Sequence, residues 1–336
     1  MSSRLFGIGI GGPFLTVDER DILRRYPPWA VILFRRNIET ATQLLALVAD
    51  LKTLSGPPVL CLDQEGGPVD RLKELLGFSI SFAAASRRGL ARRAGELAGE
   101  SCRAFGFDVN LAPVVDRGLP EAGALVLGER CAAAEPESVE RAAREYLEGL
   151  HARGVGGCLK HFPGLGRAKL DTHKSLPKLA PDPEEERLDL APFTGLMDAA
   201  GAVMISHAAG PDGTPATLSR EVGTNLLRRR LGFAGASFSD DLEMGALSEF
   251  GDLPARSAAA STAGCDLLFV CKELQAYPDC AEAVRKEVLP RRRAEAAKRL
   301  QRYRRHLQTM RDLAPPVLRP MGELIADIAE LRVQGT

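Results

Sequence analysis

The sequence lacks the features that mark several large classes of protein. Its 44 lysines and arginines equal its 44 aspartates and glutamates, so no net charge draws the chain toward nucleic acid or an anionic membrane. No apolar run approaches the ~18 residues that a membrane-spanning helix needs. The seven cysteines form no Cys-x-x-Cys pair. We therefore expect buried, reduced thiols rather than a zinc or disulfide framework.

Local signals of other functions are also missing. Residues 7–12 are rich in glycine, but their spacing is not Gly-x-Gly-x-x-Gly and Pro13 follows them, so a strand and a turn are expected there instead of a dinucleotide-binding loop. No Gly-x-Ser-x-Gly is present, which excludes a nucleophile-elbow esterase. The first residues do not resemble a secretory signal, and this predicts a cytoplasmic protein.

Short apolar runs recur along the 336 residues, and each is apolar almost throughout, as is typical of strands buried on both faces. The eight runs cover residues 5–10, 30–34, 59–63, 109–115, 155–161, 202–207, 234–240 and 266–271. Segments of helical period lie between them, at residues 40–54, 90–105, 137–152, 183–199, 221–231 and 253–263. This alternation predicts an α/β fold, a single (β/α)8 barrel. An open doubly wound sheet is the alternative, with fewer strands and usually a glycine-rich phosphate loop.

The pattern changes after residue 272. Residues 282–313 have a helical and basic pattern, interrupted at Pro290, and residues 322–331 predict a short terminal helix. Only one aromatic residue, Tyr303, stands among the basic ones and no known nucleic-acid module accompanies them, so we expect a helix packed by its apolar face outside the barrel rather than a nucleic-acid site. We predict one domain over residues 1–336, with the barrel at 5–275 and extra C-terminal helices at 276–336.

Polar side chains follow five of the predicted strands at the point where each strand ends. In barrel enzymes the carboxyl ends of the strands carry the catalytic groups, and they face one cleft. The five segments are Asp63-Gln64-Glu65, Asp116-Arg117, Lys160-His161, Ser206-His207 and Ser239-Asp240-Asp241.

These side chains suit a polyhydroxylated ligand. The carboxylates of Asp63 and Asp240, with Lys160, Arg71 and Arg130 as partners, can form charge-assisted hydrogen bonds to hydroxyl groups. A carboxylate at a strand end can also attack an anomeric carbon or stabilise an oxocarbenium ion.

A loop after the fifth run carries a possible acid/base. His173 lies two residues from Asp171, which can set its tautomer and basicity. The loop contains Pro163, Gly164 and Gly166. It could therefore close over a bound substrate.

Each of these groups also has a structural alternative. Asp63 could pair internally with a lysine or arginine, the Lys160-His161 pair could be structural, residues 171–173 could form a turn, and Asp240 or Asp241 could cap a helix. A metal-dependent hydrolase using His161, His207 and Asp240 is a further alternative, although an early His-x-His pair is missing.

Taken together, the motifs resemble those of glycoside hydrolase family 3, and within it the bacterial β-N-acetylglucosaminidases of the NagZ type. The signature is Lys-His-Phe-Pro-Gly at 160–164 with Asp-Thr-His at 171–173. Supporting segments lie at 31–37, 63–67, 111–116, 215–219 and 238–244.

The resemblance implies a retaining glycosidase that releases terminal β-linked N-acetylglucosamine from cell-wall muropeptides or anhydromuropeptides. It implies a single barrel without a second domain and without metal or organic cofactor. Because the composition indicates no nucleic-acid or membrane partner, we expect a monomer that acts on a small carbohydrate. Asp240 would be the nucleophile, His173 the acid/base and Asp171 its partner. The residues that the resemblance places on the sugar are Asp63, Arg71, Arg130, Lys160 and His161, with His207 in the cleft.

The chain departs from the family pattern at four places. Pro68 replaces an arginine, Leu165 a histidine and Arg167 an aspartate, and residues 129–133 read Glu-Arg-Cys-Ala-Ala instead of Asp-Arg-Ala-Phe-Gly. The three catalytic positions are intact, so we expect the chemistry to be retained. A degenerate sugar-binding protein is the alternative, as is a β-glucosidase or phosphorylase on the same barrel.

Overall fold

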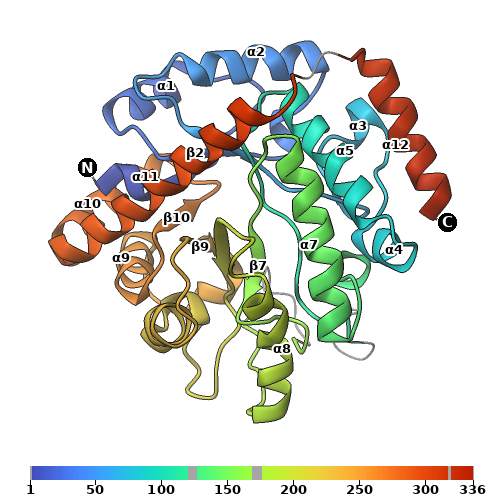
Figure 1. Ribbon diagram of the computed structural model, residues 1–336. Helices are drawn as coiled ribbons and strands as arrows, with labels where there is room; N and C mark the ends of the chain where they lie inside the picture. The colour runs from blue at the N-terminus through green and yellow to red at the C-terminus, as the bar shows by residue number, and fades with distance from the viewer. Residues whose placement is uncertain (1, 120–126, 169–175, 317–318, 336) are drawn as a thin grey trace. The chain divides into compact units, whose positions relative to one another are not determined.

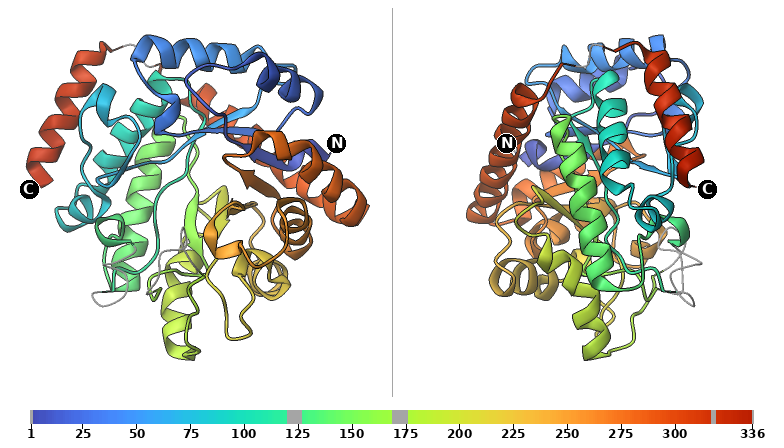
Figure 2. Two further views of the ribbon diagram at one scale, coloured as in Figure 1. Left: turned by 180° about the vertical axis from the view of Figure 1, so that it is seen from behind. Right: turned by 45° about the vertical axis from the view of Figure 1, so that its right-hand side comes forward.

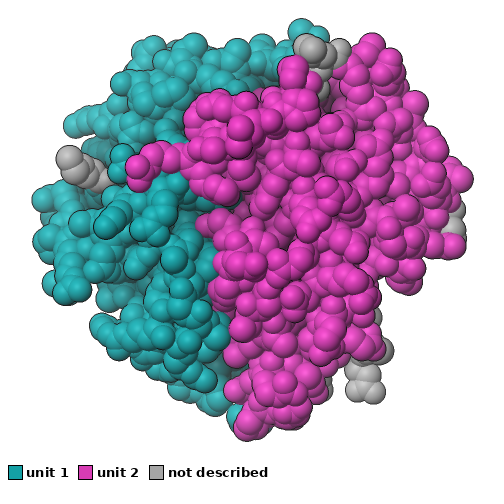
Figure 3. Space-filling view, viewed as in Figure 1, with its two compact units in different colours: residues 1–60, 170–181, 202–304 teal, residues 61–169, 182–201, 305–336 magenta. Residues whose placement is uncertain are grey.

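A computed structural model describes residues 2–119, 127–168, 176–316 and 319–335 (Figure 1). The chain divides into two compact units, and each is built from segments that are far apart in sequence (Figure 3). Unit 1 comprises residues 1–60, 170–181 and 202–304. Unit 2 comprises residues 61–169, 182–201 and 305–336.

The strands of unit 1 are parallel and lie in the order β2-β1-β10-β9-β8. Their bounds are β1 Phe6–Ile8, β2 Ala30–Leu33, β8 Ala202–Ile205, β9 Ala236–Asp241 and β10 Leu267–Val270. Ile205 of β8 is in register with Ser239 of β9. The residues that follow these two positions therefore lie next to each other at the carboxyl ends of their strands.

The last two residues of β3 (Val59–Leu62) belong to unit 2, where they pair in parallel with β6 (Val109–Asn110). Parallel bridges from Val109 to Gly156 and from Val114 to Lys160 bring in β7 (Leu159–Phe162). A small antiparallel hairpin of β4 (Gln64–Gly66) and β5 (Val69–Asp70) follows β3 directly. Asp63 thus lies between a buried parallel strand and a tight hairpin.

Helices follow the strands, and several begin at a side chain that caps the first turn. Thr16, Thr40, Asp182 and Asp252 each accept a hydrogen bond from a main-chain N–H two or three residues later. The helices are α1 Val17–Arg25, α2 Ala41–Lys52, α3 Lys73–Leu76, α4 Phe82–Arg87, α5 Ala91–Ala104, α7 Pro136–Ala152, α8 Pro183–Gly195, the π-helix η5 Glu221–Arg230, α9 Leu253–Ala263, α10 Tyr277–Glu287, α11 Pro290–Leu313 and α12 Met321–Gly335.

The α/β order that the sequence predicts is confirmed. A strand overlaps each of the eight predicted runs, and a helix overlaps each of the six predicted helical segments. The predicted break at Pro290 is also found, because α10 ends at Glu287 and α11 begins at Pro290. The hairpin β4–β5 was not predicted. The single-domain organisation stays a prediction.

The prediction of buried, reduced thiols is confirmed, since all seven cysteines are buried and in the thiol form. Burial raises the pKa of Cys102 and of Cys265 to about 12, so these thiols stay protonated at neutral pH. None of the described helices is both long enough and apolar enough to cross a membrane.

Helices α5 and α7 of unit 2 pack main chain against main chain, and they lie side by side in two views (Figures 1 and 2). Two glycines make this approach possible. A Cβ on Gly95 would lie 2.1 Å from the carbonyl oxygen of Tyr146, and one on Gly149 would lie 2.2 Å from that of Arg92. No side chain larger than hydrogen fits at either position.

We therefore expect Gly149→Ala to lower the free energy of unfolding by about 1–3 kcal/mol, because the two helices must separate to admit the methyl group. The matched control is Gly322→Ala, at a helical glycine of α12 with no atom within 4 Å of the added Cβ. It should stabilise the protein by about 0.5–1 kcal/mol through helix propensity. Urea unfolding measures both, and equal effects of the two changes would contradict the close approach.

Candidate active site

Four charged side chains form a buried network at the strand ends of unit 2. Lys160 Nζ donates to Asp63 Oδ1 at 2.8 Å and lies 2.5 Å from Glu65 Oε1. Arg130 donates two hydrogen bonds to the same Glu65 carboxylate, from Nε to Oε2 at 2.8 Å and from Nη2 to Oε1 at 3.0 Å. The side chains of Lys160 and Glu65 are each only 3% exposed. Glu65 is thus a buried carboxylate shared by two cations.

The charges in this network hold one another in the ionised state. Burial alone would raise the pKa of Glu65, but the positive charges of Lys160 and Arg130 hold it well below its usual range. Burial alone would lower the pKa of Lys160, yet Asp63 and Glu65 raise it above its ordinary value. Removing any one member would leave an uncompensated charge in a dry site.

Arg71 approaches the exposed side of the network, with its Nη2 3.7 Å from Asp63 Oδ2. Asp63 therefore lies between Lys160 and Arg71, and the internal pairing that the sequence left open is present. The two cations fix the direction of the Asp63 carboxylate. Its side chain keeps 13% of its surface exposed.

His161 is held by a buried carboxylate from the preceding strand end. Asp116 Oδ2 accepts from the main-chain N–H of His161 at 3.0 Å and lies 2.6 Å from its Nδ1, while Oδ1 accepts from the N–H of Leu165 at 2.6 Å. On the other side of the ring, Nε2 lies 3.4 Å from Nη2 of Arg130. Because a guanidinium only donates, Nε2 accepts there and the ring proton is on Nδ1. The peptide bond between Lys160 and His161 is cis.

In unit 1, His207 fixes the end of β9. It is fully buried, and its Nε2 donates to the main-chain oxygen of Asp241 at 2.8 Å, while Nδ1 lies 2.8 Å from the hydroxyl of Thr217. Asp240, on the same strand end, accepts from the N–H of Asp241 at 2.8 Å. The pair of strand ends that the register brings together is therefore joined by hydrogen bonds.

Glu243 ties the loop after β9 to the end of β10. Its carboxylate accepts from three successive main-chain N–H groups, at Cys271, Lys272 and Glu273, over 2.6, 2.6 and 2.9 Å. The pKa of Asp241 is raised to about 6, mainly by burial and further by the negative charges of Glu243 and Asp240. The interpretation of Asp240 or Asp241 as a helix cap is wrong, because β9 runs to Asp241 and α9 is capped by Asp252.

The predicted site residues thus fall into three groups. Unit 2 brings five of them together, and in unit 1 His207 and Asp240 lie on adjacent strand ends. Asp171 and His173 lie outside the described residues. The five in unit 2 are Asp63, Arg71, Arg130, Lys160 and His161.

Comparison with known proteins assigns the family. The profile of the glycosyl hydrolase family 3 N-terminal domain matches residues 15–303, which is most of the chain. The chain belongs to glycosyl hydrolase family 3. A beta-hexosaminidase of Pseudomonas aeruginosa is 36% identical to it over 304 residues, which cover 88% of this chain and 90% of the relative. A second relative, a beta-hexosaminidase of Methylococcus capsulatus, is 37% identical and covers 81% and 84% of the two chains.

Solved structures of the family confirm the fold. NagZ of Neisseria gonorrhoeae, in complex with N-trifluoroacetyl-D-glucosamine, matches with a TM-score of 0.83 and 27% identity, covering 99% of this chain and 98% of that one. A family 3 β-N-acetylglucosaminidase of Paenibacillus matches with a TM-score of 0.86 and 28% identity, covering 98% and 67%. This family 3 chain is a glycoside hydrolase, and the predicted (β/α)8 fold with C-terminal helices is confirmed.

The departures of this family 3 chain are accommodated locally. Pro68 lies in the exposed turn of the β4–β5 hairpin. Leu165 is buried, and the N–H of Leu165 is one of the donors to Asp116. Arg167 pairs through its Nε with Asp189 of α8 at 2.6 Å.

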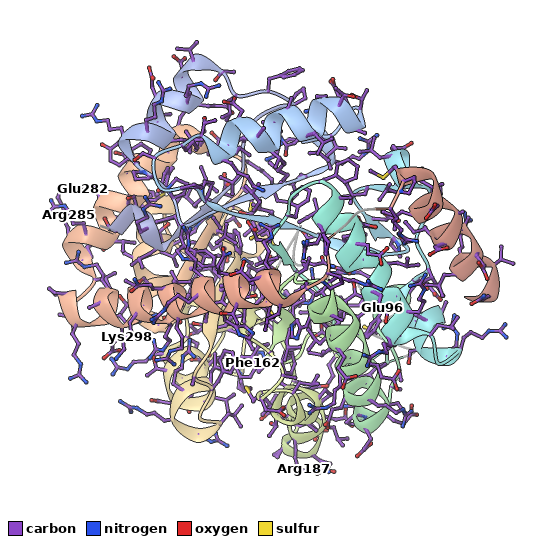
Figure 4. All side chains as sticks on the ribbon, turned by 45° about the horizontal axis from the view of Figure 1, so that its top comes forward. Glu96, Phe162, Arg187, Glu282, Arg285 and Lys298 are labelled. Atoms are coloured by element: carbon purple, nitrogen blue, oxygen red, sulfur yellow. The ribbon has the colours of Figure 1, made fainter. Side chains whose placement is uncertain are left out.

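The start of the loop after β7 is anchored on α8. Phe162, labelled in Figure 4, packs edge to face on Phe193 of α8, with ring centroids 5.3 Å apart. Asp189 accepts from Arg167 and also from Arg117 at 3.3 Å. Arg167, which departs from the family pattern, therefore helps to hold the beginning of this loop against α8.

Three carboxylates that organise the site in unit 2 were not on the predicted list. Glu65 and Asp116 stand in the quoted strand-end segments, but nothing in their spacing indicated that each binds several donors at once. Asp189 lies in a helical segment, 22 residues from Arg167. A carboxylate directly after an apolar strand was the only available signal, and it applies to Glu65 and Asp116 but not to Asp189.

The metal-dependent alternative requires a cluster of ligands. Within the part of the chain that the structure describes, no group of three His, Cys, Asp or Glu side chains could hold a metal ion. The described His161 ring is engaged by Asp116 and Arg130 instead.

The network predicts a large effect of Glu65→Gln on stability. The amide keeps the shape of the side chain but leaves the charges of Lys160 and Arg130 under-neutralised, so the free energy of unfolding should fall by about 3–5 kcal/mol. Glu129→Gln is the matched control, because Glu129 forms an exposed pair with Arg87 at 3.6 Å and should change stability by less than about 1 kcal/mol. Similar losses for both variants in urea unfolding would contradict a buried, charged Glu65.

Proposed function

We propose that this family 3 glycosidase releases terminal β-linked N-acetylglucosamine by hydrolysis with retention of configuration. The observation that carries the proposal is the buried network of Asp63, Glu65, Arg130 and Lys160 at the strand ends of a family 3 chain. Relatives named beta-hexosaminidase, and a solved NagZ that binds N-trifluoroacetyl-D-glucosamine, support N-acetylglucosamine as the sugar.

In this proposal the network binds the hydroxyl groups of the sugar. Asp63 accepts hydrogen bonds from the sugar, while Lys160, Arg71 and Arg130 donate to it. A preset array of charges binds a sugar well, because no side chain must reorganise when the ligand enters. Asp116 holds the His161 ring at its Nδ1 side, so in this proposal the Nε2 side of the ring contacts the sugar.

Asp240 is the proposed nucleophile. Its carboxylate forms a bond to the anomeric carbon while the bond to the aglycone oxygen breaks, and His173 gives its proton to that oxygen. Water then attacks the same carbon, returns a proton to His173 and frees Asp240. Asp171 sets the basicity of His173, and His207 positions the strand end that carries Asp240.

The proposed natural substrate is a muropeptide or anhydromuropeptide released during cell-wall recycling in the cytoplasm. Such a molecule ends in β-linked N-acetylglucosamine, which matches the chemistry of the network. We propose that the enzyme acts as a monomer with a single barrel domain.

The nucleophile assignment predicts that Asp240→Ala lowers kcat by at least about 10⁴-fold, as expected when a covalent intermediate can no longer form. Release of 4-nitrophenol from 4-nitrophenyl N-acetyl-β-D-glucosaminide measures it, beside the matching β-glucoside. Asp212→Ala, at an exposed loop position of unit 1, is the control and should keep full activity. Activity on neither substrate by the wild type would instead indicate a sugar-binding protein. Faster release by the wild type when phosphate is added would indicate a phosphorylase.

The acid/base assignment predicts a dependence on the leaving group. His173→Ala should lower kcat/KM by about 10²–10⁴-fold on a disaccharide of N-acetylglucosamine, whose leaving oxygen needs a proton, and much less on an activated aryl glycoside. Michaelis–Menten kinetics on the two substrates give the comparison. Equal losses on both would show that His173 does not mainly protonate the leaving group.

A further inference from the structure

A cleft of about 430 Å³ lies in unit 1 at the opposite ends of the strands from Asp240. It is lined by η5, by residues that immediately precede β10, and by the beginning of α11. Because η5 precedes β9, the cleft lies at the amino ends of β9 and β10, whereas Asp240 and His207 lie at the carboxyl ends of their strands. Six arginines line it: Arg220, Arg228, Arg229, Arg291, Arg292 and Arg299.

The cleft carries an excess of positive charge. Its lining includes two carboxylates, those of Glu287 and Glu295. A third carboxylate, that of the fully buried Asp266, accepts hydrogen bonds from arginines that line the cleft. Six guanidinium groups against three carboxylates leave an excess of three positive charges. The chain as a whole is neutral, so this excess is local.

Three of the arginines that line the cleft donate to one carboxylate, that of Asp266. Arg228 Nη2 bonds Asp266 at 2.7 Å, and the Nη1 atoms of Arg292 and Arg299 bond it at 3.0 and 3.1 Å. The pKa of Arg228 is lowered to about 10, first by burial and then by the charges of Arg299 and Arg292, although Asp266 raises it. Its buried Nε has no hydrogen-bond partner among the described residues. An anion in the cleft would offset this crowding of like charges.

At the rim of the cleft, three guanidinium groups have few partners among the described residues. Among the described residues, Arg229 bonds only Asn225, at 3.1 Å, and Arg291 bonds Glu295 at 3.0 Å while its side chain is 91% exposed. Arg220 has no ion pair among the described residues. Arginine binds phosphate through two parallel N–H groups, and a set of them around one cleft is suited to that ligand.

We propose that this cleft binds a small phosphate-bearing anion, such as a diphosphate. Each phosphate group carries about −1.5 to −2 charge at neutral pH, so two groups would neutralise the excess of three. The volume is that of a small-molecule pocket. Nucleic acid is disfavoured, because no aromatic side chain lines the cleft to stack a base.

The test is calorimetric titration of the whole chain with sodium pyrophosphate and with ADP, in buffer of constant ionic strength set by chloride. These two probes separate a free phosphate from the phosphate of a nucleotide, and saturable binding of either supports the proposal. Absence of binding by both overturns it, as does tighter binding of a single-stranded oligonucleotide than of either probe. The readout is binding, so it does not depend on whether the chain is a glycosidase.

Two double variants of equal charge locate the site. Arg229→Gln with Arg291→Gln should weaken binding at least tenfold, because each change removes a charge-assisted hydrogen bond to the anion. Arg230→Gln with Lys298→Gln removes two exposed cations from the same two helices outside the cleft, and should change Kd less than about twofold. Lys298 stands away from α11 in Figure 4. Equal weakening by both double variants would mean attraction to overall charge and would overturn the site.

Both variants should also keep the wild-type rate on 4-nitrophenyl N-acetyl-β-D-glucosaminide if the wild type shows one, because the cleft and Asp240 lie at opposite strand ends. The midpoint of thermal unfolding, Tm, gives a second readout. Saturating pyrophosphate should raise Tm in the wild type and in the Arg230/Lys298 control, because a ligand that binds only the native state stabilises it. The same rise in the Arg229/Arg291 variant would place the bound anion elsewhere and contradict the proposal.

Discussion

The strand ends of unit 2 depend on one interaction, the sharing of the buried Glu65 carboxylate by Lys160 and Arg130. Neither the carboxylate nor the lysine could stay charged in so dry a place without the other, because desolvating an unpaired ion is far more unfavourable than a typical hydrogen bond is favourable. The pairing sets the position of Lys160, and Lys160 in turn sets the direction of Asp63. The groups proposed to hold the sugar are therefore fixed by a partner that need not touch it.

Carboxylates also fix the loops that follow the strands. Asp116 accepts two main-chain N–H groups and the His161 ring, Glu243 accepts three N–H groups after β10, and Asp240 accepts the N–H of Asp241. Main-chain donors cannot rotate away, so a carboxylate held by them keeps its position when the charge nearby changes. Such preorganisation is what electrostatic catalysis requires.

The strands and most helices could be predicted because burial on both faces leaves a continuous apolar run, and exposure of one face leaves a helical period. The hairpin β4–β5 could not, since strands of three and two residues are too short to show any period. Asp63, Lys160 and His161 could be named as candidates because each lies at the end of an apolar run.

Contacts between distant segments escaped prediction for a different reason. The bond between Arg167 and Asp189 depends on how the loop after β7 meets α8, and no local pattern encodes that meeting. The same holds for Asp266, which looks like an ordinary residue before a strand but gathers three arginines from η5 and α11. Local sequence predicts which element a residue joins, whereas such partners are set by packing.

The burial of all seven thiols affects how fast their cysteines are chemically modified over time. A thiol that is protonated and shielded reacts with oxidants or alkylating agents only when its surroundings open. The rate of chemical damage at these cysteines is then governed by the opening equilibrium of the fold rather than by the concentration of oxidant alone. Any change that loosens the packing, in either unit, also shortens the chemical lifetime of the chain.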